Sequence, residues 1–357
     1  MCEQGVGLTA VAYGPNLHHL LGFDPHPTER LLLLLMSQTS EVLIVPRLHA
    51  EDVEDFDVDD VVVYTDADGP DDGLRDALER LRLEPAGASP ARRACVDEAM
   101  RADFLLLLEQ ALGGWSFSAG APVLEPMRIV KGPTELDAMR RVVALTDDAL
   151  GAIWPQIHEG MSELDAAEVV RSAFHASGAD ATAFCIVGFG PNSAAAHHQP
   201  TRRVLQDGDS VLIDIGARRE GYHSDITRVG FLGEPGPEYL GVHGIVKAAL
   251  DAALAAVRPG VPAAEVDRAA REVIAAAGYG HTFRHGVGHG IGLSVHEPPY
   301  LTDSNGRLLE EGMTFTLEPG VYRIGEFGIR LEQVVAVTAS GGQVLTGSGL
   351  DAVRLEL

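Results

Sequence analysis

The chain has 357 residues, 46% of them hydrophobic and 22% charged, which predicts a globular protein with two domains and excludes a disordered or collagen-like chain. Its 27 basic and 52 acidic residues give a net charge of −25, so nucleic acid and anionic membrane surfaces are poor partners. Three cysteines without a CxxC pair predict neither a disulfide framework nor a cysteine-based zinc site. Apolar runs such as Leu31 to Met36 are too short for a membrane span and no signal peptide is recognisable, so we expect a cytoplasmic protein.

The first part of the chain, residues 1–126, is expected to form a small α/β domain. Short apolar runs at Leu31 to Met36 and Val42 to Val45 are typical of buried strands, and Leu74 to Leu83 has the pattern of a helix. Seven carboxylates lie between Glu51 and Asp60. They are open to interpretation as a metal-binding patch, but a solvated face is the more common structure for such a segment.

The segment from Ser118 to Pro133 is rich in glycine and proline and predicts a connection between domains. The helix after it is expected to start with Thr134 as its cap and Asp137 at the position of a capping box, and apolar residues between Leu136 and Ile153 share one face. Residues 127–357 are therefore expected to form the second domain.

A weak internal repeat lies in this second domain. The segments Gly160 to Gly178 and Gly260 to Gly278 are offset by 100 residues, and Arg171 matches Arg271. The pattern predicts two similar halves. Because both segments are alanine-rich and share few identities, chance similarity is the alternative.

Four strand-like runs in the second domain each contain a carboxylate among apolar residues. The runs are Ser210 to Gly216, Ser224 to Phe231, Met313 to Tyr322 and Gly328 to Thr338, and the carboxylates are Asp214, Asp225, Glu318 and Glu332. Residues two apart in a strand share a face, so these carboxylates are expected to line one sheet surface. Burying a carboxylate is costly unless a cation compensates its charge. Salt bridges to Arg228 and Arg330 are one possible compensation, and metal ions are the other.

Two divalent cations would balance the four negative charges, and paired metals make a nucleophile at neutral pH and polarise a carbonyl. In HGVGHGIGLSVHE, residues 285–297, glycines surround His289 and allow a metal and the backbone to approach it closely. Carboxylates with one imidazole favour manganese, while cobalt, zinc and iron stay open. The glycines fit the GxGxxG pattern of a dinucleotide-binding loop poorly. The segment HEPPY, which begins at His296, lacks the second histidine of HExxH, so a helical single-zinc site is excluded there.

The first two carboxylates are 11 residues apart and the last two are 14 apart, in the contexts LIDIG, HSDITR, TLEPG and RLE, with GHGIG around the histidine. This pattern resembles the pita-bread metallopeptidases, the family of methionine aminopeptidase, aminopeptidase P and prolidase. The resemblance is strong from Met127 onward. It implies an α/β (α+β) protein in which a pita-bread catalytic domain with a pseudo-twofold repeat follows a smaller creatinase/prolidase-type α/β domain.

The resemblance implies two metal ions and five ligands, which are Asp214, Asp225, His289, Glu318 and Glu332. In this interpretation Asp225 and Glu332 bridge both ions, Asp214 completes one, and His289 and Glu318 complete the other. Glu318 is also the expected proton shuttle.

Four further residues receive roles from the same resemblance. His197 matches a loop histidine that binds substrate or steadies the tetrahedral intermediate, with His198 as the second choice. His296 would contact the scissile carbonyl. Thr227 and Arg330 would orient the carboxylates.

The expected activity is hydrolysis of Xaa-Pro bonds in short peptides by a homodimer. Some prolidases carry a basic residue soon after the histidine of the HExP segment that can hold the dipeptide carboxylate, whereas this chain has Tyr300, a candidate substrate contact. Arg47 or another front-domain residue, from this chain or from a partner subunit, could supply the missing charge. Aminopeptidase P activity on longer peptides, a metal-free creatinase-like amidinohydrolase and a silent binding protein of the same fold are the alternatives.

Overall fold

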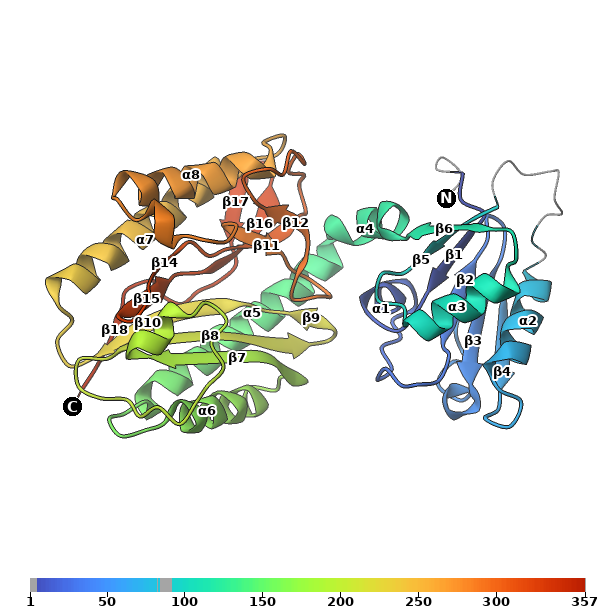
Figure 1. Ribbon diagram of the computed structural model, residues 1–357, viewed down its shortest axis with the longest axis horizontal. Helices are drawn as coiled ribbons and strands as arrows, with labels where there is room; N and C mark the ends of the chain where they lie inside the picture. The colour runs from blue at the N-terminus through green and yellow to red at the C-terminus, as the bar shows by residue number, and fades with distance from the viewer. Residues whose placement is uncertain (1–4, 82, 84–91, 357) are drawn as a thin grey trace. The chain divides into compact units, whose positions relative to one another are not determined.

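The computed structural model describes residues 5–81, 83 and 92–356, and the chain divides into two compact units, Met1–Arg128 and Ile129–Leu357 (Figure 1). Cys2 lies outside the described residues, while Cys95 and Cys185 are free, which agrees with the expectation of no disulfide framework for this part of the chain.

The first unit is built on one mixed sheet with the strand order β4-β3-β2-β1-β5-β6. Its strands are β1 Leu8–Val11, β2 Leu33–Met36, β3 Glu41–Pro46, β4 Asp60–Tyr64, β5 Arg93–Val96 and β6 Ser116–Ala119, and its helices are α1 Pro15–Leu21, α2 Pro70–Arg80, α3 Ala102–Ala111 and the 3₁₀ turn η2 Arg47–His49. The two predicted strands are confirmed as β2 and β3. The predicted helix begins earlier than expected because Pro70 suits a first helical turn, and the end of that prediction includes residue 82, which lies outside the described residues.

The predicted connection between the domains is largely regular structure. It contains the end of β6 and the helix α4 Ala121–Ile129. Pro122 lies in the first turn, where its missing N–H has no partner to lose, and Pro126 lies inside the helix. The next helix, α5 Pro133–Ile153, is capped by Gly132, whose N–H donates to Glu135 at 2.8 Å. The predicted cap at Thr134 is therefore wrong, because Pro133 takes the first helical position.

The second unit consists of two α/β halves and a small hairpin. The first half has α5, η3 Trp154–Gln156, α6 Glu163–Ala176, β7 Ala181–Phe189, η4 Gly190–Ala194, β8 Ser210–Arg219, β9 Tyr222–His223, β10 Ile226–Leu232 and the late strand β18 Val353–Leu355. The second half has α7 Pro237–Ala256, α8 Ala263–Ala276, η5 Gly280–Thr282, β11 Gly288–Gly290, β12 Glu297–Leu301, β13 Thr314–Leu317, β16 Gln333–Thr338 and β17 Gly341–Val344. The hairpin pairs β14 Gly320–Arg323 with β15 Phe327–Arg330.

The sheets of the two halves run β18-β10-β8-β7 and β12-β11-β13-β16-β17. In Figure 1 the helix α6 lies on one side of these sheets and α8 on the other. Two apolar clusters fill the spaces between helices and sheets, one around Phe174 and Phe189 and one around Val246 and Phe315. The active-site candidates lie between these layers on the strands and their ends.

The internal repeat is confirmed by matching backbone contacts. The segment before α6 forms the bridge Ser162–Val204, and the segment before α8 forms the bridge Pro262–Leu308. The N–H groups of Gly160 and Gly260 also donate to equivalent carbonyls, those of Leu205 at 3.0 Å and Leu309 at 2.8 Å. The two alanine-rich segments are thus halves of one repeated architecture.

Within the described residues, α7 is long and apolar enough to cross a membrane by length and composition alone. Its side chains at Val242, Val246 and Leu250 are buried in the same cluster as Phe315 of β13. The composition of α7 is explained by its place in the core.

Two of the four predicted strands of the second domain are interrupted. The run from Met313 to Tyr322 divides into β13 and β14, with Glu318 between them. The run from Gly328 to Thr338 divides into β15 and β16, with Glu332 between them. A carboxylate at a break is free of the strict alternation of a strand, so it can turn toward residues of the other half.

Candidate active site

The four predicted carboxylates come together from both halves of the second unit. Asp214 lies in β8, Asp225 directly precedes β10, and Glu318 and Glu332 lie at the two strand breaks. All four are largely buried, and Glu332 is only 1% exposed. The hairpin β8–β10 and the paired strands β13 and β16 place the four acids in one cluster.

His289 lies in β11 beside this cluster. Its Nε2 is 3.3 Å from Glu318 Oε1 and 3.6 Å from Asp225 Oδ2. Its Nδ1 is 3.1 Å from the carbonyl of Gly290, which can accept the Nδ1 proton, so Nε2 is the ring nitrogen that faces the acids. Ligand atoms of Asp225, His289 and Glu332 all lie within 4.8 Å of one another, the spacing a metal ion requires.

The charges of the cluster are strongly coupled. Burial raises the pKa of Asp225 well above its usual range, and the neighbouring carboxylates of Glu332 and Asp214 raise it further. Burial and the adjacent Glu318 also raise the pKa of Glu332 to about 8. Burial alone would raise the pKa of Glu318, but its hydrogen bond with His289 brings it down to about 2. Four ionised acids here need cations beyond the ones that side chains supply.

Two buried carboxylate oxygens support a metal at this place. Asp214 Oδ1 and Glu332 Oε1 have no hydrogen-bond partner within the part of the chain that the structure describes. Buried polar atoms are nearly always satisfied, and a divalent cation accepts such oxygens as ligands. The donor set of carboxylates and one imidazole therefore fits divalent metal ions.

Thr227 and Arg330 hold the carboxylates in place. Thr227 Oγ1 donates to Glu332 Oε2 at 2.8 Å, and Arg330 Nε donates to Thr227 Oγ1 at 3.0 Å. The guanidinium of Arg330 also donates to Asp214. Arg330 thus forms the predicted salt bridge to a carboxylate and at the same time orients two of the acids.

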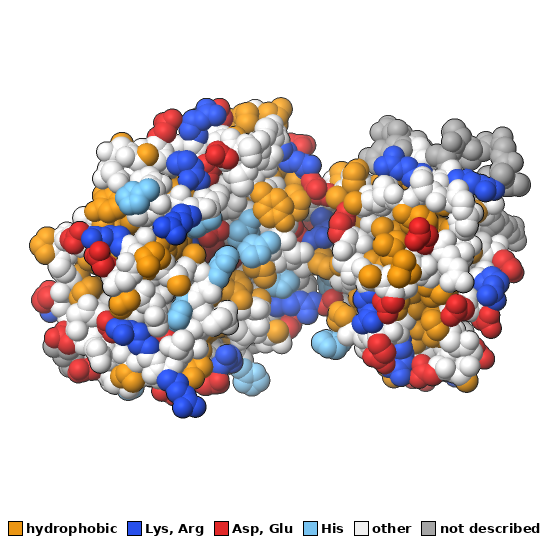
Figure 2. All heavy atoms as spheres, viewed as in Figure 1, with side chains coloured by type: hydrophobic (Ala, Val, Ile, Leu, Met, Phe, Trp, Pro, Cys, Tyr) orange, Lys and Arg blue, Asp and Glu red, His pale blue; other side chains and the backbone are white. Residues whose placement is uncertain are grey.

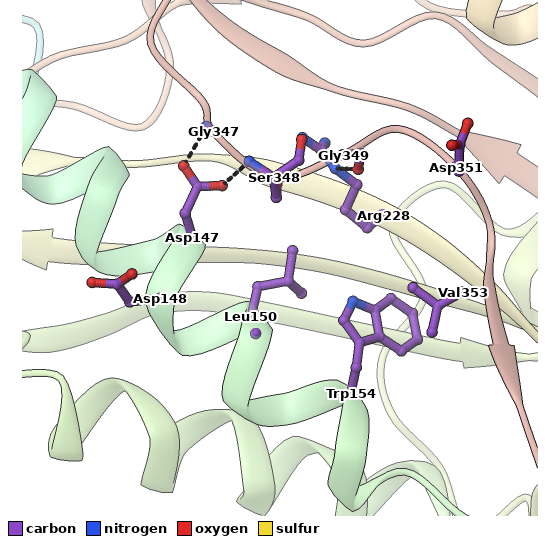
Figure 3. Close-up of a pocket in the computed structure, with 11 residues that line it drawn as sticks. Asp147, Asp148, Leu150, Trp154, Arg228, Gly347, Ser348, Gly349, Asp351 and Val353 are labelled. Carbon is purple, nitrogen blue, oxygen red and sulfur yellow. Dashed lines mark hydrogen bonds between the residues drawn. The ribbon is translucent and has the colours of Figure 1, made fainter.

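Arg228, the other arginine expected to compensate the acids, contacts Glu332 at its backbone. Its guanidinium donates to backbone carbonyls, including those of Gly349 at 2.8 Å and Glu332 at 2.5 Å. Figure 3 shows Arg228 on the wall of a pocket of about 530 Å³ with Trp154 and Asp147. Arg228 therefore ties the chain near the C-terminus to the backbone of Glu332.

Two residues of the site escaped the sequence analysis, His285 and Tyr322. His285 donates from Nδ1 to the carbonyl of Gly286 at 2.8 Å, so its Nε2 accepts the hydroxyl proton of Tyr322, also at 2.8 Å. Tyr322 in turn accepts from Arg330 Nη1 at 2.8 Å, and burial raises its pKa to about 12. The sequence offered one signal for each residue: His285 lies four positions before His289, and Tyr322 lies four positions after Glu318.

The remaining predicted residues border the cluster. The ring of His296 stands edge-on to that of His289, with centroids 4.1 Å apart. Burial lowers the pKa of His296, and the neighbouring His289 lowers it further. Histidine side chains gather on one face of the second unit in Figure 2.

Tyr300 lies directly opposite His289 in the antiparallel pair β11–β12, so its side chain is on the same face, and it is 47% exposed. His198 points elsewhere, because its Nε2 lies 2.8 Å from Glu163. The other histidine of the pair, His197, is exposed.

A repeated α/β unit that encloses buried acids and an imidazole is an arrangement that suits a metal-dependent hydrolase. Residues 137–339 match the model of metallopeptidase family M24, and residues 1–130 match the creatinase/prolidase N-terminal domain. The chain belongs to metallopeptidase family M24. The predicted family and fold are thereby confirmed, and membership implies an enzyme that uses divalent metal ions.

Similar proteins extend this match over nearly the whole chain. A probable dipeptidase PepE of Mycobacterium tuberculosis is 37% identical over 95% of this chain and 89% of its own length. A prolidase structure from Thermococcus sibiricus is 33% identical with a TM-score of 0.93, covering 99% of this chain and 96% of the other. An X-Pro aminopeptidase structure from Thermotoga maritima is 30% identical with a TM-score of 0.84, covering 98% of each chain.

Proposed function

We propose that the protein is a dinuclear-metal peptidase that hydrolyses Xaa-Pro bonds in dipeptides. The observation that carries this proposal is the buried cluster around His289, in which two carboxylate oxygens have no hydrogen-bond partner among the described residues. The similarity to a prolidase and to a probable dipeptidase supports the substrate class. We further propose that the enzyme is a cytoplasmic homodimer.

Five residues would hold the metal ions: Asp214, Asp225, His289, Glu318 and Glu332. Two divalent ions bound there supply a nucleophile from water at neutral pH and polarise the scissile carbonyl. The excess of carboxylates over imidazole favours manganese, with cobalt, zinc or iron as alternatives. The resemblance to the family assigns Asp225 and Glu332 as the residues that would contact both ions, and their ligand atoms lie within 4.8 Å of each other and of His289.

Side chains of this chain carry out the other steps. Glu318 accepts a proton from the attacking water and passes it to the departing proline nitrogen. His296 donates to the developing oxyanion, and His197 binds the substrate. Proline offers no N–H and a fixed φ, so a dedicated cleft serves it better than the extended-strand binding of general proteases.

Aminopeptidase P activity on longer peptides is the second candidate. Tyr300 stands where a basic residue would hold the carboxylate of a dipeptide, which favours longer peptides as substrates. The similarity to an X-Pro aminopeptidase also favours this activity. The dipeptidase proposal takes precedence because the more similar relatives are named for dipeptides.

Hydrolysis of Ala-Pro beside Ala-Pro-Ala tests this assignment. Protein stripped by a chelator should cleave neither peptide, and added manganese should restore cleavage of Ala-Pro because the cluster needs its cations. Cleavage of the tripeptide alone would identify an aminopeptidase. If neither peptide is cleaved although the protein holds two metal ions per chain, the silent binding protein becomes the better description.

Replacement of His296 by alanine should lower kcat by about 100-fold while metal content stays at the wild-type level, because the ring borders the cluster through His289 without occupying its centre. Turnover of Ala-Pro and metal analysis of the same sample check this. Equal loss of metal and activity would make His296 a ligand instead.

A further inference from the structure

Glu163, at the first position of α6, is a buried acid outside the metal cluster whose side chain is 0% exposed. It accepts five hydrogen bonds. They come from Phe189 N at 2.9 Å, Asn192 Nδ2 at 2.9 Å, His198 Nε2 at 2.8 Å, Thr201 N at 2.8 Å and Thr201 Oγ1 at 2.6 Å. One carboxylate thus binds the end of β7 and three positions in the first part of the segment between β7 and β8.

The bonds of Glu163 keep it ionised. Burial alone would raise the pKa of Glu163, but the hydrogen bonds from His198 and Thr201 bring it below its usual value. Neither a lysine nor an arginine is among the five donors just named, so the charge is balanced by imidazole, hydroxyl, amide and backbone groups. Five hydrogen bonds to one buried carboxylate fix the geometry of the segment from Phe189 to Thr201.

The loop carries His197 between two anchored neighbours. On one side the carbonyl of Ala196 accepts from Arg330 Nη2 at 3.3 Å, and Arg330 also contacts Asp214 of the cluster. On the other side His198 is held by Glu163. His197 itself is exposed. Because Arg330 joins the carbonyl of Ala196 to Asp214, the backbone directly before His197 is tied to the edge of the cluster. The backbone on both sides of His197 is therefore held, and its exposed ring can face a substrate.

We propose that Glu163 is a positioning residue for the peptidase reaction, which through His198 and Thr201 holds His197 at the edge of the metal cluster. The inference rests on the proposed function, since His197 acts on substrate only if the site cleaves peptides. It also gives His198 a role of its own as the anchor for its neighbour.

Glu163→Gln should lower kcat/KM for Ala-Pro by about 10- to 100-fold, because small displacements of a substrate-contacting group cost this much. Metal content should stay at the wild-type level, since no hydrogen bond of Glu163 named above goes to a carboxylate of the cluster. The loss should match that of His197→Ala, and the double variant should lose no more than either single one. Glu168→Gln is the matched control on the same helix, with a side chain 71% exposed, and should equal the wild type.

His198 provides the second test, in case Glu163→Gln folds poorly. In His198→Gln the amide N–H can replace Nε2–H, so activity should be largely kept, whereas His198→Leu should lose as much as Glu163→Gln. Hydrogen exchange gives a readout without activity: the amides of Phe189 and Thr201 should exchange faster in Glu163→Gln and stay unchanged in the control.

Three results would overturn this role of Glu163: full activity of Glu163→Gln, additive losses in the double variant, or loss of bound metal together with activity. If the wild type cleaves no Xaa-Pro peptide, the proposed function fails first. In that case the exchange experiment still tests the structural part of the proposal. If the amides of Phe189 and Thr201 exchange at the wild-type rate in Glu163→Gln, Glu163 does not hold this segment.

Discussion

Asp225→Asn should abolish peptidase activity, with a fall in kcat/KM of about 10³-fold or more. Asp225 is 5% exposed, and its Oδ2 faces His289 Nε2 at 3.6 Å. Asparagine keeps the shape but removes a charge and places an N–H₂ group among Glu332 and His289. Metal ions contribute several kcal/mol to the transition state, and each 1.4 kcal/mol is tenfold in rate.

Elemental analysis and titration with manganese should show that Asp225→Asn holds less metal per chain than the wild type. Asp251→Asn, an exposed acid on α7, is the matched control and should keep both metal and activity. Full metal content with full activity in Asp225→Asn would remove the bridging role proposed for this residue.

The metal cluster could be predicted from the sequence because it depends on features that are local in the chain. Each acid interrupts an apolar run, where an unpaired charge is expensive, and the glycines around His289 mark a close approach. Residues two apart do face the cluster together: Thr227 donates to Glu332, and Thr316 Oγ1 donates to Glu318 at 3.3 Å. This holds although Asp225 lies just outside β10, and Glu318 and Glu332 lie at strand breaks.

The residues that support the site could not be predicted in this way. Tyr322 meets His285 across 37 positions, and Glu163 meets His198 across 35. Neither contact leaves a periodic pattern in the chain, since each depends on how separate elements pack. The error at Thr134 has a local cause instead: Pro133 competes for the start of α5 and moves the cap to Gly132.

Gly288→Ala should damage both stability and metal binding. A Cβ at this position would lie 1.9 Å from the carbonyl oxygen of Thr316, which belongs to the backbone of β13. The strand β11 would have to move, and with it His289, whose N–H donates to Thr316 Oγ1 at 3.1 Å. Overpacking of this kind costs about 3 kcal/mol or more, so the midpoint of thermal unfolding should fall by about 6 to 12 °C.

Thermal unfolding and manganese titration of Gly288→Ala can be compared with Gly244→Ala, a matched control in the exposed part of α7. A Cβ at Gly244 meets nothing within 4 Å, and alanine favours a helix over glycine by about 1 kcal/mol, so this control should be slightly stabilised. If Gly288→Ala unfolds at the wild-type temperature and binds manganese equally well, β11 and β13 do not approach as closely as described. Loss of metal without loss of stability would instead mean that the strand yields locally, so that the displacement of His289 alone disables the site.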